Sequence, residues 1–351
     1  MQENISIRLM RFTKLRGVWL ALLTLILGQS GAAQNQEKLR IVGAGTTSPL
    51  AVYSRWFQDF EKIHPNFDFI YIPSGSETGI DLATSGRADF GATDAPLSNQ
   101  ALAKGNVLEF ATLLMAIVPI YNVPGVFHRL KFSSQALAGI YLGTITRWND
   151  PAIAATNPEV ALPASKIVVV HSAAGRGTTY IWSDYLSKIS VEWRTKVGRS
   201  ISVEWPVGEA CEGNGNLAKT VKQTPNSIGY VELVYAARDQ LPTGLVENAA
   251  GNFVGADVVS ITAAATAPAR QATSGFRASI TNPVGDWSYP IASFTWILIS
   301  ANSGSPAKQD AMKQFLRWML EDGQTQVQPA GFAPLPKVIV EEELHALQRI
   351  P

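Results

Sequence analysis

Short apolar runs alternate with amphipathic segments along most of the chain, and this pattern predicts an α/β fold. The short runs at 39–42, 67–72 and 90–92 predict strands. Apolar residues recur every three or four positions at 50–63, which indicates a helix, and a second helix is expected at 76–86. Strands that alternate with helices favour a largely parallel or mixed sheet.

The alternation continues toward the C-terminus without an internal repeat or a long polar linker. Two domains, if present, are therefore expected to be joined by short crossovers. Ser48 and Pro49 predict the start of the first helix, with the serine as N-cap and the proline at the first helical position. Further strands are expected at 113–120, 167–170, 228–231 and 294–299, and further helices at 180–189, 309–320 and 338–348.

The first 33 residues have the organisation of a secretory signal peptide. Four basic side chains between Arg8 and Arg16 precede an apolar run at 17–28, and small residues follow up to Ala33. This order predicts a signal peptide at 1–33 with cleavage near Ala33. The apolar run is shorter than the roughly 20 residues of an ordinary membrane-spanning helix, although a membrane anchor remains the alternative. We expect an exported, soluble, periplasmic protein.

Composition narrows the function further. The chain has 351 residues, 46% of them hydrophobic, which is enough for a sizeable core and suggests about two domains. Its formal net charge of +1 gives no overall positive field for nucleic acid. One cysteine and four scattered histidines argue against a disulfide scaffold and against a metal cluster. No cofactor or metal is expected.

Three loops rich in Gly, Ser and Thr each precede an expected helix. They lie at 43–48, 74–79 and 175–179. Backbone N–H groups and hydroxyls at the positive end of a helix bind anions, although a single such loop is more often an ordinary cap. The first and third loops do not match nucleotide motifs, because Ser48 replaces the third glycine of the dinucleotide fingerprint and the third loop lacks the Lys of a P-loop.

Four blocks of sequence resemble one known family. They are GAGTTSP at 43–49, DFGATDAPLS at 89–98, IYLGTI at 140–145 with WNDPAI at 148–153, and SIGYVE at 227–232. The blocks occur in the same order as in the phosphate-binding protein of bacterial phosphate ABC transporters, a type II periplasmic solute-binding protein. The similarity runs from about Leu39 to Pro336, which is nearly all of the chain after the predicted signal peptide.

The resemblance implies two α/β lobes joined by a two-segment hinge, with the ligand in the cleft between them. Lobe one would comprise 34–122 and 292–351, and lobe two would comprise 123–291. The implied function is to capture inorganic phosphate and deliver it to the membrane permease of an ABC transporter. We expect a monomer that is not an enzyme and does not bind nucleic acid.

The family's phosphate ligands carry over to residues in all three loops and in the second block. Asp94 would accept a hydrogen bond from protonated phosphate, and the backbone N–H of Ser48 would act as a donor. The full set implied by the resemblance is Thr47, Ser48, Ser76, Asp94, Gly177 and Thr178, to which we add Arg176.

Arg176 is added because the third loop departs from the family pattern. Ser172 stands where an arginine is usual, Ala174 replaces its aspartate partner, and Arg176 replaces a donor serine. The hypothesis is that the Arg176 guanidinium substitutes for the missing one at the anion. Two alternatives stay open at this point: the same fold tuned to another oxyanion, and a secreted hydrolase that uses a serine or Cys211, with His171 the only histidine near a candidate loop.

Overall fold

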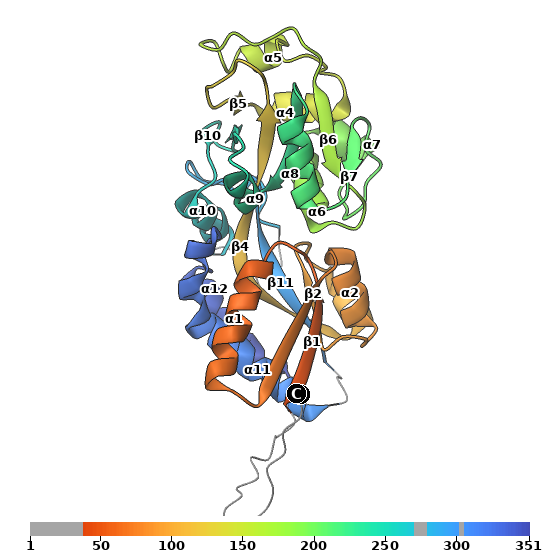
Figure 1. Cartoon of the computed structure of the whole chain (residues 1–351), viewed down its shortest axis with the longest axis vertical. Coiled ribbons are helices and arrows are strands. Elements are labelled where there is room, and N and C mark those ends of the chain that lie inside the picture. Colours follow the sequence, from red (N-terminus) through yellow and green to blue (C-terminus); the bar gives the residue numbers. More distant parts are fainter. Residues whose placement is uncertain (1–37, 270–278, 302–304) are drawn as a thin grey trace, which may run out of the picture. The chain divides into compact units, whose positions relative to one another are not determined.

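The computed structural model describes residues 38–269, 279–301 and 305–351. The predicted signal peptide and its cleavage site lie outside these residues. The larger sheet is mixed and runs in the order β2-β1-β3-β11-β4-β8-β6-β7, and a small second sheet has the order β10-β9-β5 (Figure 1). The strands are β1 Leu39–Gly45, β2 Phe67–Pro73, β3 Phe90–Thr93, β4 Val107–Asn122, β5 Lys131–Phe132, β6 Val168–Ser172, β7 Glu209–Cys211, β8 Ser227–Glu232, β9 Leu245–Glu247, β10 Phe253–Val254 and β11 Ala292–Ser300.

Helices follow most of the strands, as the alternating pattern predicts. None of the helices in the described part of the chain combines the length and the hydrophobicity that a membrane crossing needs. The helices are α1 Leu50–Ile63, α2 Ser76–Thr84, α3 Asn99–Gly105, α4 Ser134–Leu142, α5 Pro151–Ala154, α6 Gly177–Ile189, α7 Val191–Lys196, α8 Asn214–Gln223, α9 Leu233–Arg238, α10 Val258–Ala269, α11 Pro306–Glu321 and α12 Lys337–Ala346. Short 3₁₀ turns lie at Gly323–Gln326, Gln328–Ala330 and Leu347–Arg349.

Parallel pairing carries β1 next to both β2 and β3, so the segments that follow these three strands leave the same edge of the sheet. Strand β6 is likewise parallel to β8 and β7. Two of the three Gly/Ser/Thr loops follow β1 and β2, and the third follows β6. The topology therefore gathers the loops singled out in the sequence at the carboxyl ends of parallel strands.

Strand β4 is a continuous strand that belongs to two parts of the sheet. It pairs antiparallel with β11 up to Ala116 and antiparallel with β8 from Ile117 onward. Figure 1 shows β4 passing from the part that contains β1 and β2 toward the part that contains β6 and β7. The sequence pattern predicted only residues 113–120 of this strand and missed its first six residues.

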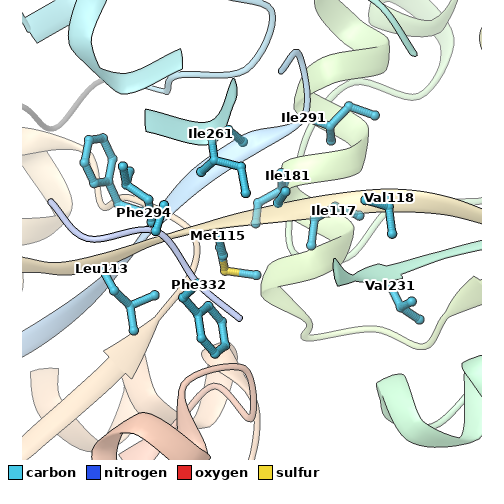
Figure 2. Packing of buried hydrophobic residues seen from close by; sticks show 14 of the residues in the cluster. Leu113, Met115, Ile117, Val118, Ile181, Val231, Ile261, Ile291, Phe294 and Phe332 are labelled. Carbon is cyan, nitrogen blue, oxygen red and sulfur yellow. The ribbon is translucent and has the colours of Figure 1, made fainter. Parts of the chain in front are cut away.

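The core is continuous around the point where β4 changes partner. Figure 2 shows Met115 and Ile117 among buried side chains from other elements, including Phe294 of β11 and Phe332. All four of these side chains are at most 2% exposed. The change of partner is therefore embedded in apolar packing rather than in a polar linker.

Candidate anion-binding site

Four helices begin at one place in the fold. The Ser76 hydroxyl, on the first residue of α2, accepts a hydrogen bond from the Asp94 N–H at 3.2 Å. The Gly177 backbone, which starts α6, packs against both of these residues. Thr178 in turn donates to Oδ1 of Asn214, the first residue of α8, at 3.4 Å. Ser48, just before α1, donates to Asp94 at 2.8 Å. Helix N-termini that meet in this way present N–H groups and positive dipole ends to one point.

None of these four helices has a side-chain cap, so their first N–H groups are not satisfied by capping side chains. Elsewhere serine side chains do cap helices, as Ser98 does for α3 and Ser133 for α4. The prediction that Ser48 caps α1 is wrong, because Pro49 occupies the N-cap position and the Ser48 hydroxyl turns to buried carboxyl groups. Uncapped N-termini are typical of sites that leave backbone donors for an anion.

Asp94 is the centre of this arrangement. Its side chain is fully buried and accepts hydrogen bonds from the hydroxyls of Thr46, Ser48 and Thr295. The distances are 2.8 Å from Ser48 and 2.7 Å from Thr295. Burial raises the pKa of Asp94 above its ordinary value, and the three hydroxyls act in the opposite direction because they stabilise the ionised form.

A second buried carboxyl group lies beside Asp94. Glu232, at the end of β8, is 1% exposed, and its Oε1 lies 2.5 Å from the Ser48 hydroxyl and 2.6 Å from Nδ2 of Asn214. Its Oε2 has no hydrogen-bond partner among the described residues. Burial raises the pKa of Glu232 to about 8, and the nearby Asp94 also raises it, while the Ser48 hydroxyl lowers it. Sequence reasoning did not assign Glu232 to the site, although it ends the block at 227–232.

In the first loop, the side chain that donates to the Asp94 carboxylate is Thr46, whereas the sequence resemblance predicted Thr47 as a site residue. Thr46 and Ser48 both reach Asp94, while Thr47 lines a neighbouring groove of about 290 Å³ together with Tyr235 and Arg238. Thr46 was missed because two adjacent threonines follow the glycines and the pattern does not distinguish them. The sequence-predicted residues Ser48, Ser76, Asp94, Gly177 and Thr178 are brought together.

Arg176 lies at the side of this cluster, next to the second loop. Its Nη2 donates to Oε2 of Glu212 at 2.6 Å, and its Nη1 lies over the Gly75 backbone. Its Nε is buried and has no partner in the described part of the chain. The second and third loops also meet directly, since the Glu77 N–H donates to the Gly175 carbonyl at 3.2 Å.

Cys211 and His171, the two residues named for the hydrolase alternative, make their contacts outside this cluster. Cys211 is half-buried and donates to the Thr220 hydroxyl, and the His171 ring stacks on Trp205 with centroids 4.7 Å apart. Within the described residues, no three His, Cys, Asp or Glu side chains are grouped in a way that could hold a metal ion.

Comparisons with known proteins agree with the resemblance. The model of the PBP superfamily domain matches residues 29–322. The phosphate-binding protein PstS of Pasteurella multocida is 36% identical over 323 residues, which cover 92% of this chain and 93% of the relative. The chain belongs to the PstS family of phosphate-binding proteins. A PstS of Methanocaldococcus jannaschii is also 36% identical, with 92% of this chain and 90% of the relative covered.

Solved structures related to the PstS family share the fold. A putative phosphate ABC transporter substrate-binding protein from Clostridium perfringens, with bound phosphate, aligns with a TM-score of 0.63. The alignment covers 85% of this chain and 100% of that chain at 18% identity. The expected two-lobe α/β fold of periplasmic binding proteins is therefore confirmed. Both of these PstS relatives are named as phosphate-binding proteins.

Proposed function

We propose that this chain captures inorganic phosphate outside the cytoplasmic membrane and delivers it to the permease of an ABC transporter. Two lines of support are the PstS names of relatives that align over about nine-tenths of the chain and the signal-peptide pattern at 1–33. In this proposal the chain is a monomer, 34–122 with 292–351 and 123–291 form the two lobes, and the cleft closes by hinge motion.

The observation that carries the proposal is a fully buried Asp94 at the meeting point of uncapped helix N-termini. Backbone N–H groups suit the oxygens of a dehydrated anion, and a carboxylate acceptor requires that the anion also carry a proton. Phosphate retains a proton at neutral pH, and sulfate does not. A site built around an acceptor rejects an analogue that lacks the donor by about 10⁴–10⁵-fold.

The proposed ligands are Ser76, Asp94 and the first-turn backbone of α6, together with residues of the first loop. The first loop would supply Thr47 and Ser48, and α6 would supply Gly177 and Thr178. Arg176 is proposed as a further anion contact, supported by its buried and unpartnered Nε among the described residues.

Titration calorimetry of the purified chain with phosphate, sulfate and a panel of other oxyanions tests the proposal. We expect one phosphate bound per chain, with sulfate much weaker and with no turnover of phosphate esters. Tighter binding of another oxyanion would instead support the same fold with a different ligand, which the altered third loop makes the specific alternative.

A further inference from the structure

Ser48 stands between two buried carboxyl groups. Its Oγ lies 2.8 Å from Oδ2 of Asp94 and 2.5 Å from Oε1 of Glu232, both within hydrogen-bond distance. A hydroxyl has a single proton to donate, and an ionised carboxylate can only accept. Both contacts are hydrogen bonds only if one of the two carboxyl groups carries a proton. The arrangement of Ser48, Asp94 and Glu232 therefore requires that one of the two carboxyl groups is protonated.

The surroundings of the two acids differ in a way that assigns this proton. Asp94 receives three hydroxyl donors, which stabilise an ionised group. Glu232 receives one side-chain amide, from Asn214, and its second oxygen has no partner in the described residues. A buried ionised carboxylate with so few donors is unfavourable. Glu232 is thus the acid that carries the proton.

Among the described residues, no positive side chain forms an ion pair with Glu232 that would stabilise its ionised form. Asp94, from the loop after β3, raises the pKa of Glu232, and Glu232 in turn raises the pKa values of the phenols Tyr230 of β8 and Tyr235 of α9. Arg238 of α9 instead pairs with Asp239 at 2.7 Å and lies over the Tyr235 ring. Asn214 accepts a hydrogen bond from Thr178 of α6 and donates one to Glu232. Through Ser48, this chain of buried hydrogen bonds continues to Asp94.

We propose that Glu232 is a neutral acid that donates to Ser48, which then donates to Asp94, and that this makes Glu232 a positioning residue for the anion site. The inference rests on the proposed function and adds a proton requirement to it. Ser48 precedes α1 and Glu232 ends β8, so the contact joins segments that are 184 residues apart in the chain. Bringing these segments together would take up a proton whenever Glu232 is ionised beforehand.

The direction of the pH dependence follows from this linkage. Glu232 has an ordinary pKa when water reaches it and a pKa raised to about 8 in the buried arrangement, with burial as the main cause. The buried arrangement is fully favoured below the ordinary pKa of a glutamate. It then becomes less favourable by about tenfold per pH unit as the pH rises to the raised value, and changes no further above it.

Calorimetry with phosphate between pH 5.5 and 8.5 tests this on the unmodified chain, Glu232→Gln and Glu232→Ala. Glutamine is always neutral and retains an N–H donor, so we expect the affinity of Glu232→Gln relative to the unmodified protein to rise by at least about tenfold between pH 5.5 and pH 8. Repeating each titration in buffers of different ionisation enthalpy should show less proton uptake in Glu232→Gln at pH 7. Glu232→Ala should bind weakly at every pH.

Phosphate itself titrates in this pH range, but this affects the unmodified chain and Glu232→Gln equally. The ratio of their two affinities therefore reports only on the protein. Glu247→Gln is the matched control, because this carboxylate accepts from the Ser134 N–H away from the site. It should follow the unmodified pH profile. If Glu232→Gln also gives a profile parallel to the unmodified protein, Glu232 is ionised or uninvolved and the inference is overturned.

A second measurement separates this inference from the proposed function. The NMR chemical shift of the Glu232 carboxyl carbon is measured against pH with phosphate present. Its signal is assigned as the one that disappears in Glu232→Gln. If no variant binds phosphate, the proposed function fails and the same titration without ligand still decides the protonation. A midpoint near 8 supports the inference, and a midpoint at or below the ordinary range of a glutamate overturns it.

Discussion

Gly177 packs directly against Asp94: a side-chain methyl group on the glycine would lie 2.6 Å from the Cβ of the aspartate and 2.6 Å from the Ser76 hydroxyl. Carbon atoms do not approach this closely, so the first turn of α6 reaches the carboxylate only because residue 177 has no side chain.

Gly177→Ala should therefore separate α6 from Asp94 and weaken phosphate binding by at least about tenfold, which corresponds to about 1.4 kcal/mol. Calorimetry measures the affinity. Gly215→Ala is the matched control, because it also lies in the first turn of a site helix, yet a methyl group there would meet no atom closer than 3.9 Å. Equal losses in the two variants would contradict the role assigned to the close approach.

Asp94→Asn should narrow the preference for phosphate over sulfate. An amide can donate an N–H to a fully ionised oxyanion, whereas the carboxylate only accepts, so sulfate should gain and phosphate should lose affinity. We expect the ratio of the two dissociation constants to fall by at least about tenfold. Asp89→Asn, at a carboxylate paired with Lys308, should change stability and leave the ratio unchanged.

Arg176→Ala tests whether the rearranged third loop contacts the anion. A charge-assisted hydrogen bond contributes roughly 1.5–3 kcal/mol, so its loss should weaken binding about ten- to a hundredfold. Glu212→Gln removes the partner of Arg176 without removing the guanidinium and should leave affinity unchanged or increase it. Full affinity of Arg176→Ala at both low and high salt would make Arg176 a partner of Glu212 alone.

Phosphate should raise the melting temperature and reduce the radius of gyration if the cleft closes around it. A ligand that binds only the native state stabilises by about 2.7 kcal/mol at a hundredfold excess over the dissociation constant. Nine tryptophans make intrinsic fluorescence a convenient reporter alongside X-ray scattering. Unchanged scattering and fluorescence under saturating phosphate would argue against hinge closure.

Asp184 should make the protein sensitive to acid. It is a buried residue of α6 that pairs with Arg199 at 2.7 Å and accepts from the Thr281 hydroxyl at 2.5 Å. Burial raises its pKa, but Lys188, the hydroxyls and Arg199 outweigh this, so the pKa of Asp184 is lowered. Ionised Asp184 therefore stabilises the fold at pH values above the ordinary pKa of an aspartate. This stability is lost as the pH falls through the lowered pKa of the folded protein.

Asp184→Asn should accordingly lower the free energy of unfolding at pH 7 by about 1–3 kcal/mol and flatten its decline below pH 5. Urea unfolding across this pH range measures both effects. A variant that loses stability in acid as steeply as the unmodified protein would show that other carboxyl groups dominate.

The sequence predicted those parts of the fold that depend on local pattern. Apolar periodicity gave α1 closely, and the glycines and hydroxyls before α2 and α6 marked loops that do meet. The same local rule failed at Ser48, since a serine before a helix is ordinarily a cap. Its actual partners, Asp94 and Glu232, are 46 and 184 residues away.

The remaining site residues are determined by pairing between distant strands, which local pattern does not specify. Thr295 reaches Asp94 because β11 pairs antiparallel with β3. The sequence of residues 292–300 does not predict this pairing or its register. Glu232 is buried because β8 ends beside the first loop. An acidic residue at the end of an apolar run predicts an exposed end of a strand equally well, so only the three-dimensional structure distinguishes these cases.

The shared strand β4 also bears on how the chain acquires its fold. Residues 123–291 synthesised alone would lack the second half of β4, and β8 would then present an unpaired edge, which invites association with other chains. Neither part of the sheet is complete until residues 107–122 have found both β11 and β8. Equilibrium unfolding should therefore follow one cooperative transition, with circular dichroism and tryptophan fluorescence giving the same midpoint, rather than two steps for two separately folding pieces.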